Sequence, residues 1–186
     1  FLREIKKDAE LSFNTNGTTL KDSTLELLQD RPNLIINISL DGIGKHNNYI
    51  RSGSNWNDIE TNVKKLKEKN IKLLFYYILQ HTSLYTFRQV YEYCTKNDIE
   101  LEIGEIYGGS VDGSGHLTLD SAKQDDVDSF RKWLGTINSP KVKVVDNWLS
   151  KYEYNDTLHR RFKQYFNMLD SVRGTNFVKT FNPCWT

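Results

Sequence analysis

The chain has 186 residues, enough to bury the core of one ordinary domain without disulfides or a structural metal. Its 25 basic and 24 acidic residues give a formal charge of +1, so we expect neither a nucleic acid nor an anionic membrane as partner. A hydrophobic content of 38% excludes global disorder. No signal peptide or bilayer-length apolar run is visible and only two cysteines are present, so we expect a cytoplasmic protein.

The sequence begins with Phe1 rather than methionine, within a segment that resembles a helix. We therefore interpret it as a fragment of a longer protein.

Two strand-like segments lie near the start of the chain. Leu11–Phe13 is a short apolar run followed by the turn residues 14–17, and 23–29 is predicted to be a short helix. Leu34–Leu40 is almost continuous in Leu and Ile, which is typical of a strand covered on both faces. This second strand ends at Asp41, which is followed by a glycine.

Two further pairs of helix and strand follow. Asn57 and Glu60 resemble a capping box that starts an amphipathic helix, and Ile71–Leu79 is predicted to be a buried strand. Within that strand, Tyr76 and its aromatic neighbours are expected to enter the core on both faces. Thr86 repeats the capping signal before a helix whose apolar stripe includes Cys94, and 100–106 is the fourth predicted strand.

The remainder of the chain is less regular. A glycine-rich loop is expected over 108–115, then a helix through Val127 and Leu134 that opens with three solvated aspartates, among them Asp126. Val142–Val145 is predicted to be a short strand. The last helix should span 157–172, with Val172 among its inward residues.

Strands that begin near residues 11, 34, 71 and 101 have the spacing of successive βα units, which produce parallel strands. Four such units are too few to close an eight-stranded barrel. The sequence therefore predicts an α/β fold: a partial (β/α) barrel with parallel strands that lacks its first strands.

Polar groups follow all four predicted strands, at 14–18, 39–42, 80–83 and Glu105. Turn chemistry explains each of them alone. Because the carboxyl ends of parallel strands lie along one edge of a sheet, the four groups together indicate a ligand site at that edge.

The segments LSFNTNGTTL and INISLDGIGKHNNYIRSGSNW resemble the third and fourth strands of the radical S-adenosylmethionine (radical SAM) enzymes. The stretch FKQYFNMLDSVRGTNFVKTFNP is similar to the end of the branch that carries a twitch or SPASM-type extension. The resemblance implies a partial radical SAM core in 1–135 and a helical, twitch-like C-terminal extension in 136–186.

The resemblance also implies a cofactor and a reaction. In the family, a 4Fe-4S cluster cleaves S-adenosylmethionine to a 5′-deoxyadenosyl radical that abstracts a substrate hydrogen. By position, Ser39 and Asp41 would lie near the ribose and methionine, Arg51 near the methionine carboxylate and Gln80 near the adenosine. The residues expected to bind S-adenosylmethionine are therefore Thr15, Asn16, Ser39, Asp41, Arg51 and Gln80.

The chain departs from the family in its cysteines. Cys94 and Cys184 are the only two, so the CxxxCxxC motif that holds the cluster is missing. We expect the cluster ligands upstream of this chain, no metal ligands within it, and no catalysis by the fragment alone. Cys94 is interpreted as a core residue and Cys184 as an ordinary thiol.

The expected partners are a peptide or small-molecule substrate and an electron donor. By position, Glu105, Tyr107 and the glycine-rich loop would contact the substrate, and His81 is the one histidine at a predicted strand end. The competing hypothesis is a non-catalytic α/β module that binds a nucleotide or a peptide. A barrel-type lyase or aldolase is disfavoured, because no lysine stands at a predicted strand end to form a Schiff base.

Overall fold

The computed structural model describes residues 4–106 and 115–182. The chain forms two compact units, one of Phe1–Tyr77 with Val90–Glu102 and one of Ile78–Gln89 with Ile103–Thr186. The predicted division at residue 135 follows a different criterion, the resemblance to a family, and stays a prediction.

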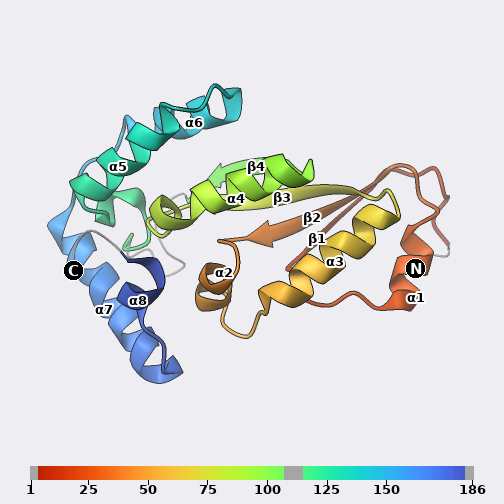
Figure 1. The fold of residues 1–186 in the computed structure, drawn as a ribbon, viewed down its shortest axis with the longest axis horizontal. Coiled ribbons are helices and arrows are strands. Elements are labelled where there is room, and N and C mark those ends of the chain that lie inside the picture. The colour runs from red at the N-terminus through yellow and green to blue at the C-terminus, as the bar shows by residue number, and fades with distance from the viewer. Residues whose placement is uncertain (1–3, 107–114, 183–186) are drawn as a thin grey trace. The chain divides into compact units, whose positions relative to one another are not determined.

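The four predicted strands form one sheet in the order β1-β2-β3-β4, and β2 pairs in parallel with both β1 and β3. This sheet, with a helix after each of its first three strands, confirms the predicted α/β fold of partial-barrel type (Figure 1). The elements are β1 (Leu11–Thr15), α1 (Asp22–Leu28), β2 (Leu34–Leu40), α2 (Lys45–Ile50), α3 (Trp56–Glu68), β3 (Lys72–Leu79), α4 (Ser83–Asn97) and β4 (Glu100–Glu105).

In the first unit, α3 packs along one face of the sheet (Figure 1). Gly17, in the turn after β1, has a φ of +72°, and a Cβ there would lie 3.0 Å from Ile38 and 3.3 Å from Ile59. Asn62 of α3 donates a hydrogen bond of 2.9 Å to the Gly17 carbonyl. Glycine is therefore required at this turn both by its backbone conformation and by the close approach of α3.

Within the described residues, the other face of the sheet is open in that it is only partly covered, so the expectation that β2 is covered on both faces was wrong. Leu34, Ile36, Ile38 and Leu40 are buried, whereas the residues between them are half-buried, and Tyr76 of β3 is 36% exposed. The apolar content of a strand does not show which of its two faces is uncovered. The polar residues within β2, Asn37 and Ser39, both lie on the less covered face and were the available signal.

Two helices begin earlier than predicted. The N-cap of α3 is Asn55, whose side chain accepts a hydrogen bond from the Asn57 amide, so Asn57 is not the cap. Helix α4 begins at Ser83, and Thr86 lies within its first turns, where its hydroxyl donates to the Thr82 carbonyl. Hydroxyl and amide side chains that bond to nearby backbone groups account for both misplaced boundaries.

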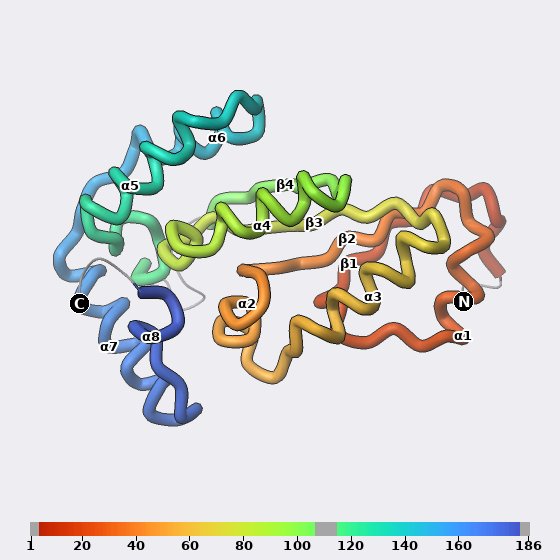
Figure 2. The backbone as a smooth tube through the Cα atoms, viewed as in Figure 1, coloured from red at the N-terminus to blue at the C-terminus, as the bar shows by residue number. Residues whose placement is uncertain are grey.

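The second unit is mainly helical after β4, which confirms the expected helical C-terminal part. The last two helices, α7 (Asp156–Arg173) and α8 (Phe177–Phe181), lie side by side (Figure 2). Their aromatic side chains form a buried cluster of Phe162, Phe166, Phe177 and Phe181. Gly174 caps α7 in the left-handed conformation, whereas Val172, expected to face inward, is 79% exposed. The elements are η1 (Leu119–Ser121), α5 (Gln124–Leu134), α6 (Pro140–Leu149), α7 (Asp156–Arg173) and α8 (Phe177–Phe181).

Residues 142–145 lie within α6, so the predicted strand was wrong. Pro140 stands in the first turn, where its fixed φ favours a helix. Val142, Val145 and Leu149 are buried at helical spacing, while Val144 is 44% exposed. The burial of one helical face outweighed the β propensity of the valines.

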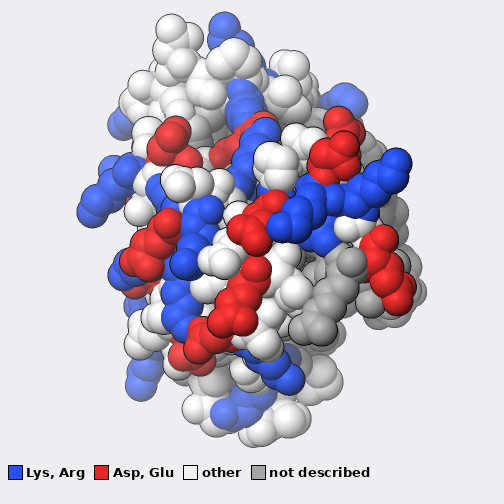
Figure 3. All heavy atoms as spheres, turned by 90° about the vertical axis from the view of Figure 1, so that its right-hand side faces the viewer, with Lys and Arg blue, Asp and Glu red and all other residues white. Residues whose placement is uncertain are grey.

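Lysines and arginines are interspersed with aspartates and glutamates on the face shown in Figure 3. Among the described residues, no helix has both the length and the apolar character needed to cross a bilayer.

Candidate cofactor site

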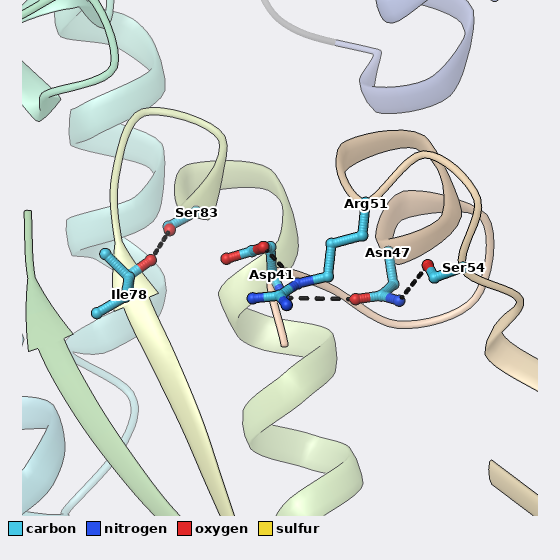
Figure 4. Close-up of polar contacts among 6 residues, drawn as sticks. All are labelled: Asp41, Asn47, Arg51, Ser54, Ile78 and Ser83. Atoms are coloured by element: carbon cyan, nitrogen blue, oxygen red, sulfur yellow. Dashed lines mark hydrogen bonds and ion pairs between the residues drawn. The ribbon is translucent and has the colours of Figure 1, made fainter. Parts of the chain in front are cut away.

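A polar cluster lies at the carboxyl end of β2 (Figure 4). Asp41 follows the strand directly, and its Oδ2 accepts a hydrogen bond of 2.7 Å from the Nε of Arg51, the residue that ends α2. The side chain of Asn47, which is fully buried, accepts from the Asp41 amide at 3.4 Å and donates to the Ser54 hydroxyl at 3.2 Å. Hydrogen bonds from α2 and its flanking turns thus fix the position of the ion pair.

Arg51 contacts Asp41 through only one of its three guanidinium nitrogens, Nε. Its side chain is 30% exposed, whereas that of Asp41 is 14% exposed. Within residues 4–106 and 115–182, its terminal nitrogens Nη1 and Nη2 make no hydrogen bond. Because Nε is held by Asp41, these nitrogens remain available as donors to an anionic group.

The two predicted residues at the end of β1 form a turn. Thr15 Oγ1 accepts a hydrogen bond of 3.1 Å from the Gly17 amide, and Asn16 Oδ1 accepts from both the amide and the hydroxyl of Thr18 at 3.1 and 2.8 Å. Thr15 also lines a cavity of about 300 Å³ against Ile38, on the helix-covered side of the sheet. Its side chain therefore lies on the opposite face of the sheet from Ser39.

The structure brings five of the six predicted residues into the first unit. Thr15 pairs with Ile38, so the turn after β1 and the end of β2 share one edge of the sheet. Ser39 is half-buried on the open face, in register with Tyr76. The assignment of these residues to a cofactor stays a prediction.

Gln80, the sixth residue, follows β3 in the second unit. Its amide donates a hydrogen bond of 2.9 Å to the Ser83 hydroxyl, which in turn donates to the Ile78 carbonyl at 3.1 Å (Figure 4). These contacts fix the backbone of the turn at Gln80. Its proposed contact with adenosine stays a prediction.

A polar ladder on the open face of the sheet was not predicted from the sequence. Asn37 Nδ2 donates to Ser12 Oγ at 2.9 Å and to Asn14 Oδ1 at 2.8 Å. The alternation of Ser12 and Asn14 with apolar residues in β1 was the available signal. The ladder makes the surface next to Ser39 polar, as a site for a polar ligand requires.

In the second unit, His81 is fully buried in a hydrogen-bonded network. Its Nδ1 lies 2.7 Å from Ser121 Oγ and its Nε2 lies 3.2 Å from the Tyr85 hydroxyl, while its ring stacks on Phe162 with centroids 3.6 Å apart. Burial first, and then nearby His159, hold the pKa of His81 well below its ordinary value of 6.5. His81 is therefore neutral at pH 7 and serves the packing of this unit.

Asp126 belongs to the same network, so the expectation of a solvated carboxylate was wrong. It is 4% exposed and accepts a hydrogen bond of 3.0 Å from the Tyr85 hydroxyl. A run of three aspartates at a helix start is normally exposed. The position of Tyr85, in the segment after β3, depends on tertiary packing that the local sequence does not encode.

Several predicted features lie outside the described residues: Tyr107, 108–114 and Cys184. Cys94 is 3% exposed within α4, as expected of a core residue. Among the described residues, no group of three or more His, Cys, Asp or Glu side chains could hold a metal ion.

Comparison with known proteins agrees with this architecture. Residues 1–94 match the family model of the radical SAM superfamily. The structure of native anSMEcpe with bound AdoMet and Kp18Cys peptide is similar with a TM-score of 0.51 and 17% identity, over 67% of this chain and 36% of that one. Streptococcus suis SuiB bound to S-adenosylmethionine matches with a TM-score of 0.47 and 15% identity, over 89% of this chain and 29% of that one. No curated protein sequence matches the chain.

Because the family model covers half of the chain, the chain belongs to the radical SAM superfamily. The match to anSMEcpe supports the fold alone at this identity, and the chain spans about a third of that protein's length.

Proposed function

We propose that this chain contributes part of the S-adenosylmethionine site of a radical SAM enzyme, at the carboxyl ends of β1 and β2. The observation that carries the proposal is the pairing of Asp41 with Arg51 through Nε alone. It leaves the terminal nitrogens of an oriented arginine free for a carboxylate, in a chain whose first half matches the superfamily.

In this proposal Arg51 binds the methionine carboxylate of S-adenosylmethionine. Guanidinium and carboxylate groups form paired, charge-assisted hydrogen bonds, and an arginine held in place loses less side-chain entropy on binding. Asp41 supplies that orientation, and Asn47 fixes the backbone of Asp41. Ser39 presents a hydroxyl on the open face for the sugar or the methionine.

When bound beside a reduced 4Fe-4S cluster, S-adenosylmethionine supplies a 5′-deoxyadenosyl radical for hydrogen abstraction. The residues described do not fit the cluster itself: Cys94 is buried, and such clusters are held by several cysteines. We therefore place the cluster ligands in a part of the protein outside these 186 residues and assign this chain a binding role.

The proposed substrate is a peptide. The related proteins anSMEcpe and SuiB have been solved with a Kp18Cys peptide and with the precursor peptide SuiA, respectively. We further propose a twitch-like role for the helical C-terminal part, a separate electron donor, and a cytoplasmic location in keeping with the few cysteines of the chain.

The test uses the protein from its complete reading frame, reconstituted with iron and sulfide without oxygen and reduced with dithionite. We expect formation of 5′-deoxyadenosine from S-adenosylmethionine, measured by mass spectrometry. Arg51→Gln should lower the rate at subsaturating S-adenosylmethionine by about tenfold, since a charge-assisted hydrogen bond contributes about 1.5–3 kcal/mol.

Arg131→Gln is the matched control, because Arg131 also pairs through Nε with an aspartate, Asp146, at 3.2 Å, but on the surface of the second unit. Its rate should equal that of the unmodified protein. Absence of 5′-deoxyadenosine would refute the enzymatic proposal and favour a non-catalytic binding module. Equal rates for Arg51→Gln and Arg131→Gln would refute the role of Arg51.

A further inference from the structure

The second unit contains a cavity of about 420 Å³ next to the end of β4. This volume is in the range of sites that hold a small molecule or a long side chain. Its wall is mixed: Glu105 and Asp120 supply carboxylates, Trp148 and Tyr152 supply aromatic rings, and Leu119 and Leu158 supply aliphatic surface.

The acidic groups of this wall are not neutralised by ion pairs. In the described parts of the chain, neither Glu105 nor Asp120 pairs with a cationic side chain. Lys151, an exposed residue, also borders the cavity and makes no ion pair within the described residues. The side chains that line the cavity therefore include two carboxylates and one ammonium group, a net negative charge.

Two of the wall residues are held in place. Asp120 Oδ1 accepts a hydrogen bond of 3.0 Å from the Glu153 amide, and its carbonyl accepts one of 2.8 Å from the Asn155 amide. The Tyr152 hydroxyl donates to the Ala122 carbonyl at 2.8 Å. The carboxylate and the ring thus keep their positions before any ligand arrives, which lowers the entropic cost of binding.

Tyr152, which borders the cavity, lies near the negative charge of Asp120. The pKa of Tyr152 is raised to about 12, first by burial and then by the nearby charge of Asp120 and other groups. Only the second of these causes, the negative charge of Asp120, also attracts a cation.

We propose that this cavity binds a lysine or arginine side chain of the peptide substrate. The aliphatic stem of such a side chain would lie against Leu119 and Leu158, and its charged end would meet the carboxylates and the aromatic rings. The inference rests on the proposal that the substrate is a peptide, but it does not depend on S-adenosylmethionine.

The test measures binding of acetyl-Ala-Ala-Lys-Ala-Ala-amide to the full 186-residue chain by NMR, following the indole signal of Trp148. A Trp148→Phe variant identifies that signal. We expect saturable binding, and about tenfold weaker binding of the same peptide with norleucine, which keeps the stem and removes the charge.

Glu105→Gln and Asp120→Asn should each weaken binding of the lysine peptide by about three- to tenfold. Asparagine retains the oxygen that accepts from Glu153, and Glu105 makes no side-chain hydrogen bond within the described residues, so at least one variant should fold normally by circular dichroism. Glu102→Gln is the matched control, because it removes the same charge from an exposed position of the same strand.

Three results would overturn the proposal: no shift of the Trp148 signal, equal affinity for the norleucine peptide, or an equal loss in Glu102→Gln. A titration of the same sample with S-adenosylmethionine separates the two proposals. Binding of S-adenosylmethionine without peptide binding would overturn the cavity assignment alone, and the reverse would leave it intact.

Discussion

At the residue scale, we propose that the Asp41–Arg51 pair orients a binding group and contributes little to the stability of the fold. Both side chains reach solvent, and ion pairs of this kind contribute about 1 kcal/mol or less to stability. Asp41→Asn keeps an oxygen that can accept from Arg51, so its unfolding free energy should fall by no more than about 1 kcal/mol. Urea denaturation checks this prediction.

A loss several times larger in Asp41→Asn would mean that the pair is a structural brace, and the case for a binding role of Arg51 would weaken. Arg131→Gln removes the more exposed ion pair with Asp146, so its loss of unfolding free energy shows how much a surface ion pair contributes in this protein.

Individual site residues were predictable where turn chemistry and strand position coincide. Asp41 and Arg51 are ten positions apart in the sequence, and the short helix between them brings them into an ion pair that the sequence did not predict. Asn37 and Asp126 were not recognised, because their partners, Asn14 and Tyr85, come from other elements of the fold. A single sequence shows a polar residue but not the partner that gives it a role.

At the element scale, the starts of α1, α3, α4, α5 and α7 were predicted to within about four residues, whereas α2, α6 and α8 were not predicted as helices. Ser, Thr and Asn occur both at N-caps and within the first turn, so several candidates compete for each cap. The strand expected at 142–145 failed for another reason: Val142 and Val145 have the spacing of a helical face as well as strong β propensity. Short apolar runs of this kind are ambiguous until their packing is known.

The N-cap of α3 allows a direct test of which asparagine begins the helix. Asn55→Ala should lower the unfolding free energy by about 1 kcal/mol, because the Asn57 amide would lose its acceptor. Asn57→Ala is the matched control and should change it by less than about 0.5 kcal/mol. Thermal and urea denaturation of both variants would measure the difference. The opposite ranking would restore Asn57 as the cap.

At the scale of the whole molecule, the chain combines a sheet unit that matches the superfamily with a helical unit built around a buried polar network. The sheet could be predicted because β2 and β3 are mostly apolar and the four strands follow one another at the spacing of βα units. The division into two units could not, since it depends on contacts between segments far apart in the sequence, such as Ser121 with His81.

The buried histidines predict how stability depends on pH. His81 and His159 both have a lowered pKa, chiefly through burial, so the unfolded chain binds more protons than the folded chain as the pH falls below 6.5. Their contribution is present above pH 6.5 and is lost below it. Between pH 7.5 and 5.5, His81 should therefore account for a measurable loss of unfolding free energy.

Urea denaturation at the two pH values, on the unmodified chain and on His81→Asn, isolates this contribution. His81→Asn should be less stable at pH 7.5 but should lose less on acidification. An unchanged loss in this variant would show that His81 is not held neutral in the folded chain.

The central claim is that this chain binds S-adenosylmethionine at the end of β2 through Arg51. The most direct measurement is an isothermal titration of S-adenosylmethionine into the 186-residue chain, its Arg51→Gln variant and its Arg131→Gln control. The account predicts saturable binding that weakens by about tenfold in Arg51→Gln and does not change in Arg131→Gln. No binding, or binding that is indifferent to Arg51, would contradict it.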